Sequence, residues 1–207
     1  MTAKSSACLL AFFGAAHWSP AVACPVAADL EIGVIVEFEG GDFTHIERTA
    51  AGVVRETEFI ADLDEATVYE SSNGVLETAY FAPFEEESEF FSYSFPTDNL
   101  APLSPYSGAD GFRATLDISG QELERIAFSY ESQELREISI GDCSFQSISF
   151  QTRISDATGS KTVLYEFLVD LMIPIIVGFN YDDDADVFPP IHIRAAEIGE
   201  LDKLLSD

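Results

Sequence analysis

The side chains with the most clearly defined chemistry in this sequence are two cysteines, Cys24 and Cys143. In an oxidising compartment such a pair is expected to form a disulfide. The alternative for Cys24 is a lipid anchor, because Ala21-Val22-Ala23-Cys24 resembles a lipoprotein signal, with Ala21 where Leu is commonest. We predict the disulfide, which requires Cα atoms roughly 4.4–6.8 Å apart.

The stretch before Cys24 has the three parts of a secretory signal peptide. Lys4 gives a positive charge, Ala7–Ala16 forms an apolar core, and Ala21-Val22-Ala23 offers a small-residue cleavage site. The apolar core is too short to cross a bilayer. We therefore expect residues 1–23 to be a signal peptide and the protein to be periplasmic or secreted, with a membrane attachment only if Cys24 is lipidated.

The remaining candidates for catalysis do not form a known pattern. His45 and His192 belong to no H-E-x-x-H motif, and no C-x-x-C pair is present. Ser107-Gly108 lacks the preceding glycine that a G-x-S-x-G nucleophile elbow needs. We therefore expect no cofactor, and we favour a non-catalytic protein over an enzyme.

The acidic stretch Asn180–Asp186 is the one candidate metal site. Asp182, Asp184 and Asp186 alternate as at the start of an EF-hand loop. Counted from Asp182, however, Val187 stands where the loop needs glycine and Ile193 where it needs the bidentate glutamate. The sequence predicts a solvated acidic turn, and an irregular calcium site is the alternative.

The charge of the chain limits its partners. Its 37 Asp and Glu residues against 10 Lys and Arg give a formal net charge of −27 at pH 7. Such a surface repels phosphate backbones and anionic lipid headgroups, so nucleic acid is excluded as a partner. The hydrophobic content of 47 % and the 17 Phe residues are typical of a folded protein with a sizeable core.

Short apolar runs separated by turn signals predict an all-β fold. We expect a single antiparallel, strongly curved sheet or half-barrel of about a dozen short strands, with a short C-terminal helix at Glu197–Leu205. The predicted strands are Ile32–Phe38, Phe43–Thr49, Val53–Ile60, Ala66–Glu70, Val75–Phe81, Glu89–Phe95, Phe112–Ile118, Leu123–Tyr130, Glu134–Ile140, Cys143–Ile154, Thr162–Phe167, Ile173–Phe179 and Ile191–Ala195.

The most apolar run outside the N-terminus, Val163–Phe179, is the expected centre of the core. It is not a membrane span, because Glu166, Asp170 and Pro174 interrupt it. Alternation predicts two strands joined by a turn at Val169–Met172. Each strand should place its alternate residues on one face: Val163, Tyr165 and Phe167 in the first, and Ile173, Ile175, Val177 and Phe179 in the second.

Two further features concern the organisation of the chain. In Cys143–Ile154 the apolar residues change parity, which predicts a β-bulge near Gln146-Ser147. The stretch 96–111 contains three prolines and two glycines and predicts a long loop. We interpret this loop as the joint between two halves of a single all-β domain, residues 24–207.

Several stretches resemble a group of uncharacterised periplasmic proteobacterial β-proteins. These are GDFTHIERTAAGVVRETEFI (41–60), SSNGVLET (71–78), IGDCSF (140–145) and the spacing from Tyr165 to Ile173-Pro174. The sheets of such proteins curl into a half-barrel like that of the periplasmic lipoprotein-localisation carriers. The resemblance implies a periplasmic, non-enzymatic domain, and it transfers no functional residue.

The leading hypothesis for function is a secreted binding or accessory module. A curved sheet could present a Phe-rich concave face to an apolar small molecule or a protein partner. The alternatives are that these aromatic residues simply form the core, that the protein is a carboxylate-based hydrolase, or that it is a structural protein acting through a sheet edge. The candidate face is formed by Phe91, Tyr93, Phe95, Phe128 and Tyr130.

Overall fold

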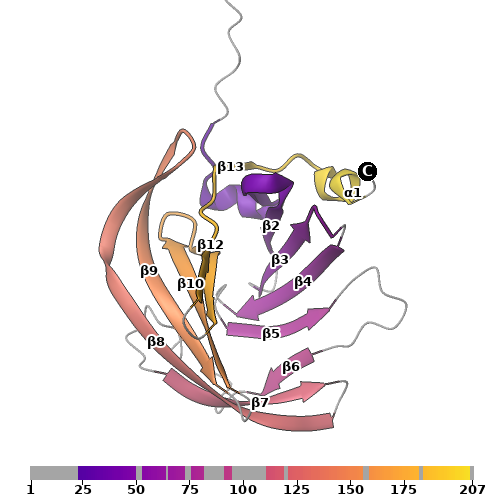
Figure 1. Ribbon diagram of the computed structural model, residues 1–207. Helices are drawn as coiled ribbons and strands as arrows, with labels where there is room; N and C mark the ends of the chain where they lie inside the picture. Colours follow the sequence, from indigo (N-terminus) through magenta and orange to yellow (C-terminus); the bar gives the residue numbers. More distant parts are fainter. Residues whose placement is uncertain are drawn as a thin grey trace, which may run out of the picture.

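The fold is all-β, as predicted. The computed structural model describes residues 23–49, 53–63, 65–72, 76–81, 91–94, 111–118, 121–155, 159–181 and 184–205. Within these ranges thirteen strands form one antiparallel sheet in the order β12-β11-β10-β9-β8-β7-β6-β5-β4-β3-β2-β1-β13. Each strand from β1 to β12 therefore lies beside its neighbour in sequence, and the sheet curls around the molecule (Figure 1).

The elements follow one another with short connections in most of the described chain. The strands are β1 Val34–Glu37, β2 Phe43–Arg48, β3 Val53–Ile60, β4 Glu65–Ser72, β5 Leu76–Phe81, β6 Phe91–Ser94, β7 Gly111–Ile118, β8 Gln121–Ile140, β9 Cys143–Ser155, β10 Ser160–Leu168, β11 Ile173–Tyr181, β12 Asp184–Val187 and β13 His192–Ala195. Two 3-10 turns, η1 Ala27–Glu31 and η2 Glu39–Gly41, flank β1. The C-terminal helix α1 covers only Glu200–Leu204, and no helix in the described ranges has the length and apolar character needed to cross a membrane.

The apolar run at the centre of the sequence forms two paired strands. β10 and β11 match the predicted strands with one or two extra residues at their ends, and Pro174 lies opposite Phe167 near the start of β11. Val163, Tyr165 and Phe167 are all buried, as their common face predicts. The missing N–H of Pro174 is tolerated there because the strand has only just begun.

The prediction that Phe179 shares one face of β11 with Ile173 and Ile175 is wrong. The register between β10 and β11 shifts after Leu164, which pairs with Gly178, whereas Tyr165 pairs with Ile176. Val177 is thus the extra residue of a β-bulge, and such a bulge changes which residues share a face. Ile173 and Ile175 pack in one hydrophobic cluster, whereas Phe179 packs with the other.

The predicted bulge at Gln146-Ser147 is also wrong, because the irregularity belongs to the neighbouring strand. β9 pairs with β10 in unbroken register. Between β8 and β9 the register shifts from Ser132 to Leu135, so β8 carries the extra residue. The two predicted strands Leu123–Tyr130 and Glu134–Ile140 are consequently one bent strand, β8.

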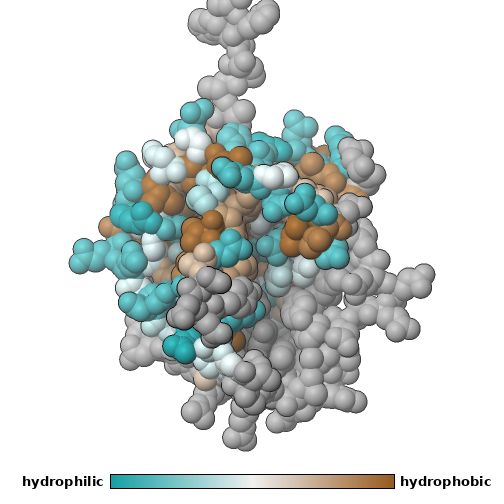
Figure 2. Space-filling model, viewed as in Figure 1, coloured by the Kyte–Doolittle hydropathy of each residue, from teal (hydrophilic) through white to brown (hydrophobic). Residues whose placement is uncertain are grey.

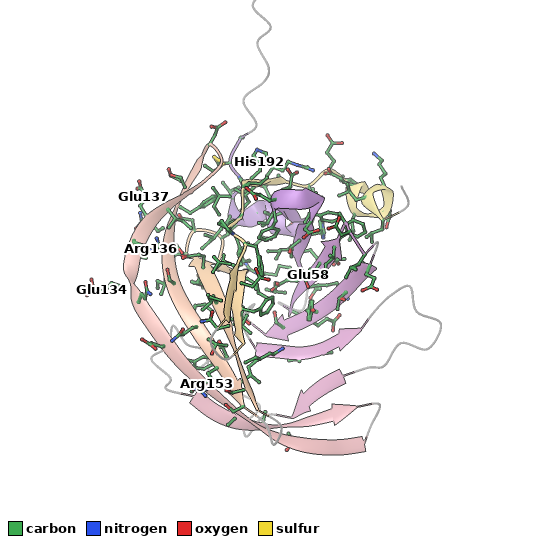
Figure 3. All side chains as sticks on the ribbon, viewed as in Figure 1. Glu58, Glu134, Arg136, Glu137, Arg153 and His192 are labelled. Carbon is green, nitrogen blue, oxygen red and sulfur yellow. A yellow bond between two sulfur atoms is a disulfide. The ribbon has the colours of Figure 1, made fainter. Side chains whose placement is uncertain are left out.

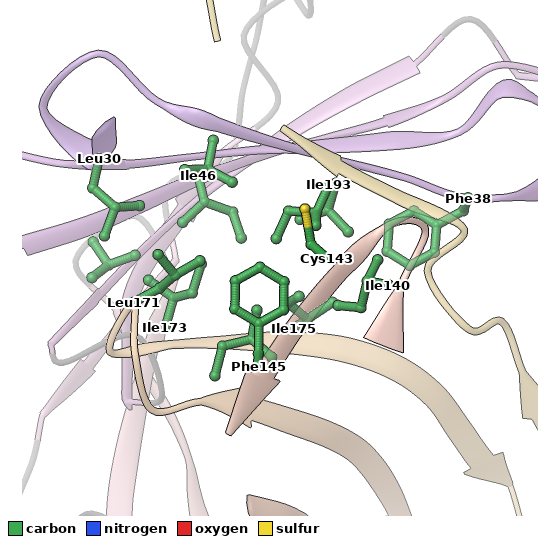
Figure 4. Packing of buried hydrophobic residues seen from close by; sticks show 14 residues of the cluster. Leu30, Phe38, Ile46, Ile140, Cys143, Phe145, Leu171, Ile173, Ile175 and Ile193 are labelled. Atoms are coloured by element: carbon green, nitrogen blue, oxygen red, sulfur yellow. The ribbon is translucent and has the colours of Figure 1, made fainter. Parts of the chain in front are cut away.

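The change of parity in β9 has a different cause: the strand buries opposite faces at its two ends. Phe145 belongs to a cluster that joins β1, β2, β3 and β13 to β8–β11 (Figure 4). Phe150 belongs to a second cluster, where its ring stacks on Tyr165 with centroids 4.7 Å apart. The first cluster also contains Val34, Ile46, Val54, Ile140, Cys143, Leu168, Leu171, Ile173, Ile175 and Ile193.

The disulfide is confirmed. Cys24 and Cys143 are bonded across 119 residues of sequence, with Cα atoms 5.5 Å apart. The bond fixes the start of the described chain to the start of β9. It also engages the Cys24 sulfur that a lipid would need, which argues against the lipid anchor.

The two ends of the sheet approach each other without pairing. After β12, Phe188 N donates to Val177 O at 3.0 Å, and Ile191 N donates to Glu37 O at 2.9 Å. Between them lie Pro189 and Pro190, which have no N–H to donate. The segment therefore crosses from β12 to β13 through these two prolines, and among the described strands β12 and β13 do not pair, so the sheet stays open.

Candidate functional site

A cavity of about 310 Å³ lies between the β2–β3 strands and the β11–β12 edge of the sheet. Its walls come from the start of β2 and the end of β3 on one side, and from β11, β12 and the following segment on the other. The lining residues are Phe38, Glu39, Asp42, Phe43, Thr44, Glu58, Phe59, Ile60, Phe179, Asp186, Val187, Phe188 and Pro189. We call this cavity the seam pocket.

Five phenylalanines give the seam pocket an aromatic wall. Phe43 and Phe59 are direct partners in the β2–β3 register, and their rings stack with centroids 5.1 Å apart. From the opposite side, the ring of Phe188 lies 5.9 Å from that of Phe38 and 5.5 Å from that of Phe179. Phe188 therefore joins the two walls, and its backbone bond to Val177 holds it in place.

Glu58 brings a carboxyl group into this aromatic setting. It lies on β3 in the middle of the molecule, whereas Glu134, Arg136 and Glu137 lie along the outer side of β8 (Figure 3). Its Oε2 accepts a long hydrogen bond of 3.4 Å from the Tyr69 hydroxyl. Burial raises the pKa of Glu58 above its ordinary value, the Tyr69 hydrogen bond partly opposes this rise, and the nearby negative charge of Asp42 adds to it.

The mouth of the seam pocket combines acidic and apolar side chains. Asp42 is held by the backbone, since its Oδ1 accepts a hydrogen bond of 2.8 Å from Ala61 N. Ile60 and Val187 are 37 % and 57 % exposed although both are large and apolar. On the face of the protein shown in Figure 2, hydrophobic patches lie among hydrophilic ones.

Of the aromatic residues predicted as a binding face, only Tyr130 has a described side chain, and it does not line the seam pocket. Phe91 and Tyr93 lie on β6, and Phe128 and Tyr130 lie on β8. Phe95 is outside the described residues, as are the side chains of Phe91, Tyr93 and Phe128. Tyr130 is half-buried, so the predicted face remains a prediction.

The acidic stretch predicted as a turn contains a strand. β12 occupies Asp184–Val187 and pairs with β11, with Asp186 opposite Phe179. Asp182 and the side chain of Asp184 are outside the described residues, as is most of the predicted loop 96–111. Among the described side chains, no three His, Cys, Asp or Glu residues are grouped as metal ligands.

The two histidines among the described residues have separate structural settings. His45 is buried beneath Gly33, and burial lowers its pKa, an effect that the charge of Glu47 partly opposes. His192 is half-buried on β13, with Nδ1 3.7 Å from Glu37 Oε2. They lie on opposite sides of β1, which pairs with both of their strands, and neither lines the seam pocket.

A second polar cluster, on β8–β10, is already saturated with hydrogen bonds. Glu166 accepts from Ser147 Oγ at 2.6 Å and from Ser149 Oγ at 2.7 Å, and it forms an ion pair with Arg136. Arg136 also donates to Ser149. Because these polar groups satisfy one another, the cluster is better explained as a cross-strand contact than as a binding site.

Sequence reasoning missed the seam pocket because its residues come from distant parts of the chain. Phe38 and Phe188 are 150 positions apart in the sequence, yet their rings touch. The only local signal in the sequence was that a phenylalanine repeatedly stands next to an acidic residue, as in Phe38-Glu39, Asp42-Phe43 and Glu58-Phe59. No known family model, curated protein or solved structure matches the chain.

Proposed function

We propose that this protein is a non-catalytic binding module that holds an apolar group in the seam pocket. The observation that carries this proposal is a cavity of about 310 Å³ with five phenylalanines in its wall. Small-molecule sites are typically apolar cavities of about 300–1,000 Å³ with a few polar groups. The seam pocket is near the lower limit, so its ligand is a small molecule or a single apolar chain.

The exposed residues at the mouth support the same function. Ile60 and Val187 place exposed apolar surface directly beside the phenylalanines of the pocket, where a ligand that enters the cavity would cover it. We place the protein in the periplasm or the extracellular space, because the disulfide between Cys24 and Cys143 is compatible with an oxidising compartment. The likeness to lipoprotein-localisation carriers is consistent with this proposal and stays a prediction.

Binding of a neutral fluorescent probe, N-phenyl-1-naphthylamine, tests the proposal. The chain from Cys24 onward should give a saturable rise in fluorescence, since an apolar pocket excludes water from the dye. Val187→Gln should weaken binding severalfold. Leu135→Gln is the matched control, because Leu135 is equally exposed at 57 % but lies on β8. Absence of saturable binding, or an equal loss in both variants, would contradict the proposal.

One observation favours a second candidate, a carboxylate-based hydrolase. Glu58 and Asp42 both line the pocket, and burial, with an added effect of the Asp42 charge, raises the pKa of Glu58; carboxyl groups whose pKa values are pushed apart are what such a hydrolase needs. The aromatic wall makes binding the better-supported function. Hydrolysis of 4-nitrophenyl esters or glycosides that is lost in Glu58→Gln would establish the enzyme, and absence of turnover by the wild type would exclude it for these substrates. The sheet-edge hypothesis stays a prediction.

A further inference from the structure

We propose that the ligand of the seam pocket carries a positively charged ammonium group at one end of its apolar part. This inference rests on the proposed function and adds the charge of the ligand to it. It is carried by the side chains that share the pocket with the phenylalanines: Glu39, Asp42, Glu58 and Asp186. The described lining includes four carboxyl groups and no lysine, arginine or histidine.

Two of these carboxyl groups, Glu58 on β3 and Asp42 at the mouth, have no cationic partner among the described residues. Glu58 is bonded only to the Tyr69 hydroxyl, at 3.4 Å. Asp42 accepts from the backbone N–H of Ala61, which is a neutral donor. By contrast, Arg194 on β13 forms ion pairs with both Glu37 and Glu200. A partly buried carboxylate without a cationic partner, such as Glu58, is costly, and an ammonium group bound beside it would reduce that cost.

The phenylalanine rings of the pocket also favour a positively charged ligand. The face of a phenylalanine ring is electron-rich and attracts cations placed over it. The rings of Phe38 and Phe188, which contact each other, line the cavity together with the carboxyl group of Glu58. Rings together with carboxylates suit an alkylammonium group, whereas a fatty-acid carboxylate would be repelled.

The net charge of the whole protein also favours a positively charged ligand. With a net charge of −27, the protein attracts cations and repels anions over a Debye length of about 8 Å at physiological salt. This general attraction cannot by itself select a ligand. The experiment must therefore separate the carboxyl groups of the pocket from the charge of the surface.

Isothermal titration calorimetry with three ligands of equal chain length tests the inference. Octylammonium, 1-octanol and octanoate share the same alkyl chain and differ in the charge of the end group. At physiological salt we expect octylammonium to bind about tenfold more tightly than octanol, and octanoate to bind most weakly. Ethylammonium, which has almost no apolar part, should show no saturable binding, since the alkyl chain supplies part of the affinity.

Variants identify the carboxyl groups that are responsible. Glu58→Gln should remove most of the difference between octylammonium and octanol, because it removes the charge of a lining residue and keeps a side chain of nearly the same size. Asp186→Asn is a second variant at an exposed position of β12, so it keeps the test available if Glu58→Gln fails to fold. Glu134→Gln is the matched control, because it removes one charge from an exposed position of β8 far from the pocket.

The outcomes separate the inference from the proposed function. Equal affinity for octylammonium and octanol, or tighter binding of octanoate, would overturn the inference and leave the apolar binding function in place. If none of the three binds, both the inference and the proposed function fail. If Glu134→Gln weakens octylammonium as much as Glu58→Gln does, the preference comes from surface charge and the inference is wrong.

Discussion

The guanidinium group of Arg48 on β2 donates a hydrogen bond of 3.0 Å to the carbonyl oxygen of Met172, in the turn between β10 and β11. The same Nη2 lies 3.3 Å from Leu171 O. Met172 has a φ of 57° although it is not a glycine, so this turn needs support from elsewhere. The contact therefore joins β2 to the strained turn between β10 and β11.

We predict that Arg48→Met lowers the free energy of unfolding by about 1–2 kcal/mol. Methionine keeps the apolar stem but cannot bond the turn carbonyls, and hydrogen bonds from a charged donor are worth about 1.5–3 kcal/mol before exposure reduces them. Urea denaturation measures the change. Arg153→Met is the control, because among the described residues the Arg153 side chain bonds Ser160 on the adjacent strand and no turn carbonyl; we expect a change within about 0.5 kcal/mol. Equal losses of unfolding free energy in the two variants would show that the contact with the turn does not contribute to stability.

We predict that Cys143→Ser costs about 2–5 kcal/mol of stability. The disulfide closes a loop of more than one hundred residues, which restricts the unfolded chain strongly. Chemical denaturation of the oxidised protein and the variant measures the loss, and Ser144→Ala, at the exposed neighbouring position, is the control. Intact mass before and after reduction should differ by two hydrogen atoms. A lipid mass on Cys24 would contradict the disulfide.

We predict that Glu58→Gln changes how stability depends on pH. The pKa of Glu58 is raised in the folded protein, so its favourable contribution is complete below the unfolded pKa of about 4.3 and is lost as the pH rises through the folded pKa. The variant should therefore gain stability over the wild type at pH 8 relative to pH 4. Urea unfolding at both values measures this gain.

The control for Glu58 is Glu134→Gln, which removes an exposed carboxyl group from β8. It should change stability by a similar small amount at both pH values. A pH-independent effect of Glu58→Gln would indicate that the Glu58 carboxyl is well solvated in the folded protein. That result would also weaken the case for an ammonium ligand.

We predict that Gly33→Ala is among the most damaging small substitutions in the protein. Gly33 has a φ of +134°, and an added Cβ would lie 2.0 Å from Nε2 of the buried His45. Backbone strain and overpacking together should cost about 3–5 kcal/mol. Gly40→Ala is the control, since Gly40 also has a positive φ, of +87°, but has open space around it; we expect only about 1–2 kcal/mol there.

A double-mutant cycle can separate the two causes of the destabilisation by Gly33→Ala, backbone strain and the steric conflict with His45. If the steric conflict with His45 dominates, His45→Ala should recover a large part of the loss caused by Gly33→Ala. Additive losses in the double variant would instead assign the cost to the backbone alone. Denaturant unfolding of the four proteins gives the coupling energy.

The sequence by itself determined the fold class, most strands and the disulfide. Alternation of apolar residues is a local property, so Val53–Ile60 was predicted with the bounds that the structure has. Glycine and asparagine turns separated the strands for the same reason. The pairing of Cys24 with Cys143 followed from the compartment and from the lack of another cysteine after the predicted signal.

Only the tertiary structure decided the bulges and the seam pocket. The bulge at Val177 and the irregularity between Ser132 and Leu135 depend on how two strands align, which neither strand encodes alone. The parity change in β9 was visible in the sequence, but its cause is a sheet that curls and buries both faces. The pocket forms because that curl brings Phe188 to Phe38 and Glu58 into one cavity, and contacts between residues so far apart leave no spacing pattern in the chain.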